Sequence, residues 1–281
     1  MKTSQSKRSK FLILAVSIFL LSCTHSNGDI NESKGYQFSD NTALSDKFKS
    51  NLNNVFNSLS SNVAANGFYK STFGKNSDKV YGLAQCRADI SPANCTNCIN
   101  ESINVALQNI SNSNSVEVWF TWCFLRYSNE SFFGVWEKGS MGVTTDTGFD
   151  DAAVVPKGVA FMSGIASMAP NKPRMVEMSV LDVGQSGKRY GMAQCRRDLS
   201  RSDCGKCLDD QLMSFTYSVE DKRGWEIYGM SCSMWYHDFQ FYSNISITAS
   251  AGGGKLCHGI TAVSMTILSF ILTFLLAFRD L

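Results

Sequence analysis

Four cysteines recur at a constant offset of 109 residues, and this repeat constrains the fold more than any other feature of the chain. The two sets are Cys86, Cys95, Cys98 and Cys123, and Cys195, Cys204, Cys207 and Cys232. The flanking residues repeat as well, since Tyr-Gly-Leu-Ala-Gln-Cys-Arg-Ala-Asp-Ile-Ser at 81–91 returns as Tyr-Gly-Met-Ala-Gln-Cys-Arg-Arg-Asp-Leu-Ser at 190–200. Because self-similarity at a fixed period marks a duplicated structural unit, we predict two copies of one domain.

The N-terminus has the order of regions found in a secretory signal. Basic residues at positions 2, 7, 8 and 10 precede an apolar run from Phe11 to Leu21 and a polar stretch from Ser22. We therefore expect residues 1–23 to be a signal peptide and the rest of the chain to be exported. A retained anchor is one alternative, although the run is shorter than the about 20 residues that span a bilayer. A bacterial lipoprotein signal, in which Cys23 is lipidated, is the other.

Export to an oxidising compartment favours disulfides over free thiols. An even set of cysteines at repeated spacing predicts a disulfide framework there, but four cysteines allow three pairings and spacing leaves the choice open. Zinc held by four converging thiolates is the alternative. The secretory context disfavours it, so no metal or other cofactor is expected.

Sequons for N-glycosylation agree with export. The predicted glycosylation sites are Asn31, Asn109, Asn129 and Asn244. A fifth sequon, at Asn94, has a framework cysteine as its middle residue and is left out of this set.

A second hydrophobic run, at residues 260–278, is followed by three further residues. Its 19 uncharged residues are enough to span a bilayer. The preceding spacer, residues 249–259, contains Ser250, Ala251 and Gly252, which are small residues of the kind found where a GPI anchor is attached. The run is therefore predicted to be a transmembrane anchor or a GPI-attachment signal. A buried core helix is the third interpretation, and the glycines before the run disfavour it.

Both copies show the same order of expected elements. An apolar stripe at helical spacing runs from Leu44 to Val63 and returns around Ile165, and a second helix is expected to begin near Cys98 and again near Cys207. A helix start near Cys98 would make Cys95 and Cys98 poor mutual partners. The expected strands are 80–87, 116–127 and 132–136, and then 175–180, 189–196, 225–236 and 239–247. This mixture predicts α+β domains, at 30–143 and 144–248, with helices on one face of an antiparallel sheet.

The repeated motif resembles a plant domain. Cys-x8-Cys-x2-Cys, preceded by Tyr-Gly-x-Ala-Gln and followed by Cys-Phe-Leu-Arg-Tyr-Ser at 123–128, is similar to the ginkbilobin-homologous (stress-antifungal, salt-stress response) domain. Tandem copies behind a signal peptide resemble cysteine-rich repeat secretory proteins, and an anchor without a kinase resembles their plasmodesmata-located subgroup. The resemblance implies two helices over a five-stranded antiparallel sheet in each copy. It implies disulfides joining Cys86 to Cys95, Cys98 to Cys123, Cys195 to Cys204 and Cys207 to Cys232.

Each domain lacks one disulfide that is typical of the family it resembles. Members of the family carry a further bridge in each domain, and both of its cysteines are absent here. Each domain is therefore expected to be less stable than a three-bridge relative by a few kcal/mol. Cys23 and Cys257 stay unpaired in this scheme.

The resemblance also implies a mannose site, which the sequence does not reproduce. The positions of its arginine and glutamate hold Glu117 and Ser128 in the first copy and Glu226 and His237 in the second. Because glutamate in place of arginine removes a donor and reverses the charge, mannose binding at these positions is not expected. The ligand-binding residues are therefore unknown.

No enzymatic activity is expected. His25 and His258 lie in the terminal segments, so a repeated Ser-His-Asp or Cys-His arrangement would have to be built from His237 alone. Structural roles are assigned to other notable residues: a surface or core histidine at His237, turn caps at Asp89 and Asp198, a solvated face at Arg196, Arg197 and Arg201, and core or sheet-face aromatics at Trp119, Phe120, Trp122, Phe132, Phe133 and Trp136. A net charge of +2 gives no case for a nucleic-acid partner.

These observations favour a non-enzymatic, membrane-anchored interaction protein on the extracellular face of the plant plasma membrane. By resemblance it would act at plasmodesmata, on cell-to-cell traffic or defence signalling, through protein or cell-wall glycan partners. One alternative is a secreted carbohydrate-binding antifungal module in the apoplast. Another is an apoplastic redox sensor that uses its disulfides.

Overall fold

The structure is a computed structural model that describes residues 30–39, 44–109, 112–144 and 148–243. The predicted signal peptide, spacer and C-terminal run lie outside the described residues, as do Cys23, Cys257, Asn244 and the three predicted GPI-attachment residues. Within the described ranges, no helix has the length and apolar character needed to cross a bilayer.

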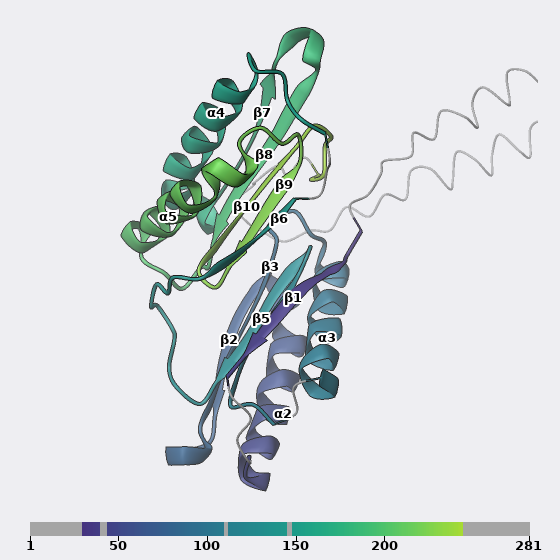
Figure 1. Cartoon of the computed structure of the whole chain (residues 1–281). Coiled ribbons are helices and arrows are strands. Elements are labelled where there is room, and N and C mark those ends of the chain that lie inside the picture. Colours follow the sequence, from purple (N-terminus) through teal and green to yellow (C-terminus); the bar gives the residue numbers. More distant parts are fainter. Residues whose placement is uncertain (1–29, 40–43, 110–111, 145–147, 244–281) are drawn as a thin grey trace, which may run out of the picture. The chain divides into compact units, whose positions relative to one another are not determined.

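Each repeat consists of a five-stranded antiparallel sheet with two helices on one face (Figure 1). The strand orders are β1-β4-β5-β3-β2 and β6-β9-β10-β8-β7. The first repeat contains β1 (Ser33–Phe38), α2 (Asp46–Asn62), β2 (Phe68–Phe73), β3 (Val80–Cys86), α3 (Pro92–Asn109), β4 (Ser115–Phe120) and β5 (Cys123–Ser128). The second contains β6 (Ser140–Thr144), α4 (Val155–Met168), β7 (Val176–Asp182), β8 (Lys188–Cys195), α5 (Arg201–Val219), β9 (Trp225–Gly229) and β10 (Cys232–His237). The predicted α+β fold with two domains is confirmed.

The glycine of the repeated Tyr-Gly motif lets the first helix of each repeat approach its sheet. A Cβ atom on Gly82 would lie 2.2 Å from Cγ1 of Val55 in α2. At the matching place in β8, a Cβ atom on Gly191 would lie 2.6 Å from Cδ1 of Ile165 in α4. Any larger residue would push the helix away from the buried apolar side chains that it covers.

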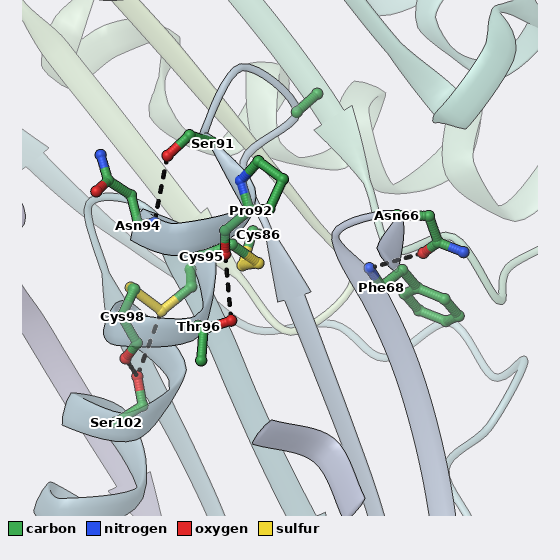
Figure 2. The surroundings of a disulfide bond; sticks show 12 residues. Asn66, Phe68, Cys86, Ser91, Pro92, Asn94, Cys95, Thr96, Cys98 and Ser102 are labelled. Carbon is green, nitrogen blue, oxygen red and sulfur yellow. Dashed lines mark hydrogen bonds between the residues drawn. A yellow bond between two sulfur atoms is a disulfide. The ribbon is translucent and has the colours of Figure 1, made fainter. Parts of the chain in front are cut away.

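Two disulfides in each repeat fasten one helix turn to two neighbouring strands. Cys86 and Cys123 face each other on β3 and β5, and they bond to Cys95 and Cys98 of α3 (Figure 2). The second repeat bonds Cys195 to Cys204 and Cys207 to Cys232 in the same arrangement. These are the pairs that the resemblance implies. Because the sulfur atoms are bonded in pairs, these cysteines offer no thiolate to a zinc ion.

The start of α3 differs from the prediction. The helix begins at Pro92, not near Cys98, because Pro92 has a backbone suited to a first helical position and the Ser91 hydroxyl accepts the Asn94 N–H at 3.2 Å (Figure 2). Cys95 and Cys98 therefore both lie inside the helix, one turn apart. They bond to different residues because two strands lie beneath that turn.

Three further corrections concern strands. Residues 116–127 form two strands, β4 and β5, and residues 225–236 likewise form β9 and β10. Residues 132–136 and the described part of 239–247 are not strands. Strands β1, β2 and β6 were not predicted; each lies at a sheet edge, where little burial is required and the apolar alternation is weak.

The predicted domain boundary also needs correction. Strand β6 pairs with β9 of the second sheet, although the boundary between residues 143 and 144 falls inside it. The division between the sheets therefore lies between Ser128 and Ser140.

Candidate functional site: the interface between the repeats

The sheet face that the helices leave free is buried against the other repeat. Leu83 follows Gly82, whose α-carbon faces α2, so its side chain points away from the helices. Leu83 is nevertheless fully buried, and so is Met192 at the corresponding position of β8. On the same face, the indole N–H of Trp119 donates to the carbonyl of Gly229 in the second repeat, at 3.2 Å.

A reciprocal pair of glutamines joins the two sheets. The side-chain amide of Gln85 donates to the Cys195 carbonyl at 2.9 Å, and its oxygen accepts the Arg197 N–H at 2.9 Å. Gln194 makes the same two bonds to the first repeat, to the carbonyl of residue 86 at 3.0 Å and the N–H of residue 88 at 2.9 Å. Each bond is therefore duplicated at the 109-residue offset. In both repeats, the glutamine of the motif binds backbone groups of the other repeat.

The motif arginines also reach across the interface. Arg196 pairs with Asp198 at 2.7 Å and donates to the carbonyls of Phe132 at 2.9 Å and Val135 at 2.8 Å. Its guanidinium carbon lies 5.5 Å from the centroid of the Phe132 ring. Since Phe132 follows the last strand of the first repeat, this segment is held by the second repeat.

The first repeat makes the matching contact. Arg87 pairs with Asp89 at 2.7 Å, lies 5.4 Å from the Phe241 ring centroid and donates to the Phe241 carbonyl at 3.3 Å. Phe241 is the counterpart of Phe132. The prediction of simple turn caps at Asp89 and Asp198 is therefore incomplete, because each carboxylate also balances a buried arginine.

The predicted solvated arginine face is wrong for two of its three members. Arg196 is buried and Arg197 is half-buried, both through contacts with the first repeat, whereas Arg201 is exposed as expected. Of the six aromatics expected in the core or on sheet faces, three are buried and three are less completely covered; the buried ones are Trp119, Phe120 and Phe132.

The two positions at which the resemblance implies a mannose-binding arginine are enclosed by the chain itself. Glu117 is buried and pairs with Arg126 at 3.0 Å. Glu226 is buried and forms hydrogen bonds with Tyr228 at 2.7 Å and His237 at 3.2 Å. It also forms an ion pair with Lys34 at 3.1 Å. Lys34 belongs to β1, so this last pair joins the repeats. Neither carboxylate is available to an external sugar.

The pKa values of these two glutamates are shifted in opposite directions. Burial raises the pKa of Glu117, and the charge of Arg126 only partly opposes it. For Glu226 burial is again the largest single effect and acts upward. The hydrogen bonds from His237 and Tyr228 and the charge of Lys34 together outweigh it and lower the pKa to about 2.

We predict that Glu226→Gln removes pH-dependent stability. Because the folded pKa lies below the ordinary value of 4.5, the carboxylate stabilises the fold above pH 4.5, and this contribution is lost as the pH falls from 4.5 toward 2. The variant should lose about 3 kcal/mol of unfolding free energy near neutral pH and approach wild type at low pH. Urea unfolding from pH 3 to 7 measures this difference.

The counterpart variant, Glu117→Gln, is the control. Its folded pKa is raised, so the protonated group stabilises the fold below pH 4.5 and that contribution declines as the pH rises. The glutamine variant should therefore gain stability relative to wild type as the pH rises. Identical pH profiles for the two variants would contradict these opposite assignments.

The cavity at the interface is too small for an organic ligand. It has a volume of about 40 Å³ and is lined by Gln85, Gln194, Trp122 and residues near them. Sites for small molecules usually measure about 300–1,000 Å³. This cavity has room for little more than water, so ligands would have to bind elsewhere on the surface.

The predicted glycosylation sites differ in accessibility. Asn129 is exposed, as is the excluded Asn94, whereas Asn31 is half-buried and its amide donates to Glu101. Asn109 ends α3, and its side chain is not among those described. A further sequon, Asn-Glu-Ser at 100–102, was not among the predicted sites, although it fits the same Asn-x-Ser pattern.

We predict an N-glycan at Asn100. Asn100 is exposed on α3, and its side-chain oxygen accepts a hydrogen bond from the hydroxyl of Ser60 at 2.6 Å. Asn100→Gln should lower the intact mass of the exported chain by one glycan. Asn97→Gln, at an exposed asparagine of the same helix outside any sequon, should change no glycan. An unchanged glycan mass for Asn100→Gln would show that the sequon is unused.

Comparison with known proteins identifies the family. A family model described as salt stress response/antifungal matches residues 31–130 and 160–239, once in each repeat. The chain belongs to this family. The resemblance that the motifs indicated is thereby confirmed.

Relatives of this chain match it over most of its length. The antimicrobial ginkbilobin-2-like protein of Castanea crenata is 30% identical over 239 residues, which cover 82% of this chain and 95% of that protein. Cysteine-rich repeat secretory protein 55 of Arabidopsis thaliana is 29% identical over 224 residues, 72% of this chain and 80% of that protein. A solved structure, the tandem DUF26 ectodomain of the Arabidopsis thaliana cysteine-rich receptor-like protein PDLP5, matches 73% of this chain and 98% of that chain, with a TM-score of 0.60 and 24% identity. That similarity shows the shared fold.

Proposed function

We propose that this family member is a non-enzymatic, membrane-anchored interaction protein on the extracellular face of the plant plasma membrane. It acts at plasmodesmata, on cell-to-cell traffic or defence signalling, by binding protein or cell-wall glycan partners. The anchor in this proposal is the hydrophobic run at 260–278. Extracellular placement is supported by the disulfide framework and by relatives named as secretory.

The observation that carries this proposal is the closure of the sheet faces. The Gln85 and Gln194 contacts join the repeats, and Glu117 and Glu226 are enclosed with partners from the chain itself. The repeats therefore present helices, sheet edges and the rim of their interface to a partner. A protein that offers such surfaces and small cavities is suited to binding extended partners, not to converting small substrates.

A secreted antifungal module is the second candidate function. It is favoured by the similarity to the Castanea crenata protein, whose name states antimicrobial activity. A redox sensor finds less support, because all eight disulfide cysteines are buried to 5% exposure or less. Reagents in solution exchange with exposed sulfur atoms more readily than with buried ones.

The test is the location of a full chain that carries a fluorescent protein directly after the predicted signal peptide. The proposal expects punctate signal at the cell boundary that persists after plasmolysis. A control chain ending at residue 248 should be released into the wall space. Uniform wall signal from the full chain would contradict anchorage and favour the secreted module. Release by phospholipase would identify the anchor as GPI.

A further inference from the structure

Two arginines of the second repeat meet at one carbonyl group of the first. Arg197 Nη1 donates to the Asn66 carbonyl at 2.8 Å, and Arg174 Nη2 donates to the same oxygen at 3.3 Å. The Arg197 guanidinium also lies 5.4 Å from the centroid of the Phe68 ring. The Asn66 side chain accepts the Phe68 N–H at 3.0 Å, which fixes the turn that presents this carbonyl (Figure 2).

No carboxylate balances these two charges among the described residues. Neither arginine takes part in a salt bridge there, and Glu177, three residues after Arg174, pairs with Lys172 at 3.2 Å. Nε of Arg174 is buried and has no hydrogen-bond partner in the described part of the chain. Burial lowers the pKa of Arg197, and the charge of Arg174 lowers it further. Two like charges in contact are favourable when an anion binds both.

The interface does not require the Arg197 side chain. Its counterpart at the 109-residue offset is Ala88, and the Ala88 N–H donates to Gln194 as the Arg197 N–H donates to Gln85, both at 2.9 Å. The same backbone contact thus forms with alanine on the other side of the interface. The Arg197 guanidinium is therefore not part of the contacts that the two repeats share.

The backbone conformation at Arg174 also departs from the one at the corresponding place in the first repeat. Arg174 has φ of 63°, a left-handed conformation that residues other than glycine rarely adopt. Asn66, which stands two residues before β2 as Arg174 stands two before β7, has φ of −150°. The next residue is left-handed in both repeats, with φ of 76° at Gly67 and 51° at Met175, so the repeated turn accounts for Met175 but not for Arg174. Such conformations cluster at sites where a side chain is held for binding.

We propose that Arg174 and Arg197 bind the carboxylate groups of an acidic, uronic-acid-containing polysaccharide. Guanidinium groups pair with carboxylates through two parallel hydrogen bonds, and two guanidiniums at one edge can hold consecutive carboxylates. The half-buried Phe68 ring offers an apolar surface on which a sugar ring packs, which favours a sugar acid over an acidic peptide. The site deepens the proposed function and rests on it, because it names the chemical class of a glycan partner.

The test is calorimetric titration of the full chain, purified from a secretory host, with oligogalacturonate. Arg197→Ala and Arg174→Ala should each weaken binding by at least about tenfold, since each loses charge-assisted hydrogen bonds. Arg201→Ala, at an exposed arginine on the same repeat, should change affinity less than about twofold, as expected for a charge outside the site. Affinity should fall with added salt. Arg197→Ala should unfold at the wild-type temperature, because Ala88 makes the same backbone contact at the corresponding position of the first repeat.

Three results would overturn the proposal. Equal binding of the methyl-esterified oligomer would show that carboxylates are not recognised. Equal binding of polyaspartate would assign the site to acidic peptides, and equal binding of inorganic phosphate would make it a general anion site. If the fluorescent chain is anchored at the cell surface but wild type does not bind oligogalacturonate, the inference fails and the proposed function stands.

Discussion

Arg196→Ala is expected to lower the free energy of unfolding by about 3–5 kcal/mol. The Arg196 guanidinium is buried, and its loss leaves the buried Asp198 carboxylate without its cation. It also removes the hydrogen bonds that the guanidinium donates to the carbonyls of Phe132 and Val135. Whole domains are stable by only about 5–15 kcal/mol, so this substitution removes a large part of the total. The segment around Phe132 should also lose protection from hydrogen exchange.

Arg197→Ala is the matched control for that experiment. It removes an arginine at the next position, but the alanine counterpart at position 88 shows that the interface forms without it. Its cost should be within about 1 kcal/mol. Urea unfolding followed by tryptophan fluorescence compares the two variants. Equal losses of unfolding free energy in the two variants would contradict the conclusion that the interface requires Arg196 but not the Arg197 side chain.

The double variant Gln85→Leu with Gln194→Leu is expected to uncouple the repeats. Each substitution leaves a buried carbonyl and a buried N–H unpaired across the interface, at about 1–3 kcal/mol for each group. A simple sum over the four groups is about 4–12 kcal/mol. The effects of the two single substitutions should not add exactly, because the two side chains act at one contact. The repeats of the double variant should then unfold in separate transitions.

Gln211→Leu serves as a control inside one repeat. Gln211 is also buried, but its amide donates to the Cys232 carbonyl of its own repeat at 2.9 Å. This variant should be less stable and should keep a single transition. Loss of the single transition in the control, or its survival in the double variant, would contradict the role of the two interface glutamines.

Much of the fold was predictable because the repeat and the helices produce patterns that are visible in short stretches of sequence. The 109-residue repeat gave two domains, and the apolar stripe around Val55 and Leu59 gave the first helix. Edge strands such as β1 and β6 escaped prediction because most of their side chains need no burial. The boundary error follows from the same cause, since β6 carries little apolar signal before it joins the second sheet.

The interface was less predictable because its contacts join residues about 110 positions apart. Arg196 stands in a cluster of charges, which by itself indicates a solvated surface, and its burial depends on Phe132 of the other repeat. The charges of Glu117 and Glu226 were enough to predict that mannose is not bound at these two positions, and this stays a prediction. Their enclosure was not predictable, because no local pattern shows that two sheets cover each other.

If both repeats form one cooperative unit, they should unfold together in scanning calorimetry of the full chain. We expect one transition whose calorimetric and van't Hoff enthalpies agree, because the reciprocal glutamine and arginine contacts couple the repeats. Two resolved transitions, or a van't Hoff enthalpy near half the calorimetric value, would contradict it.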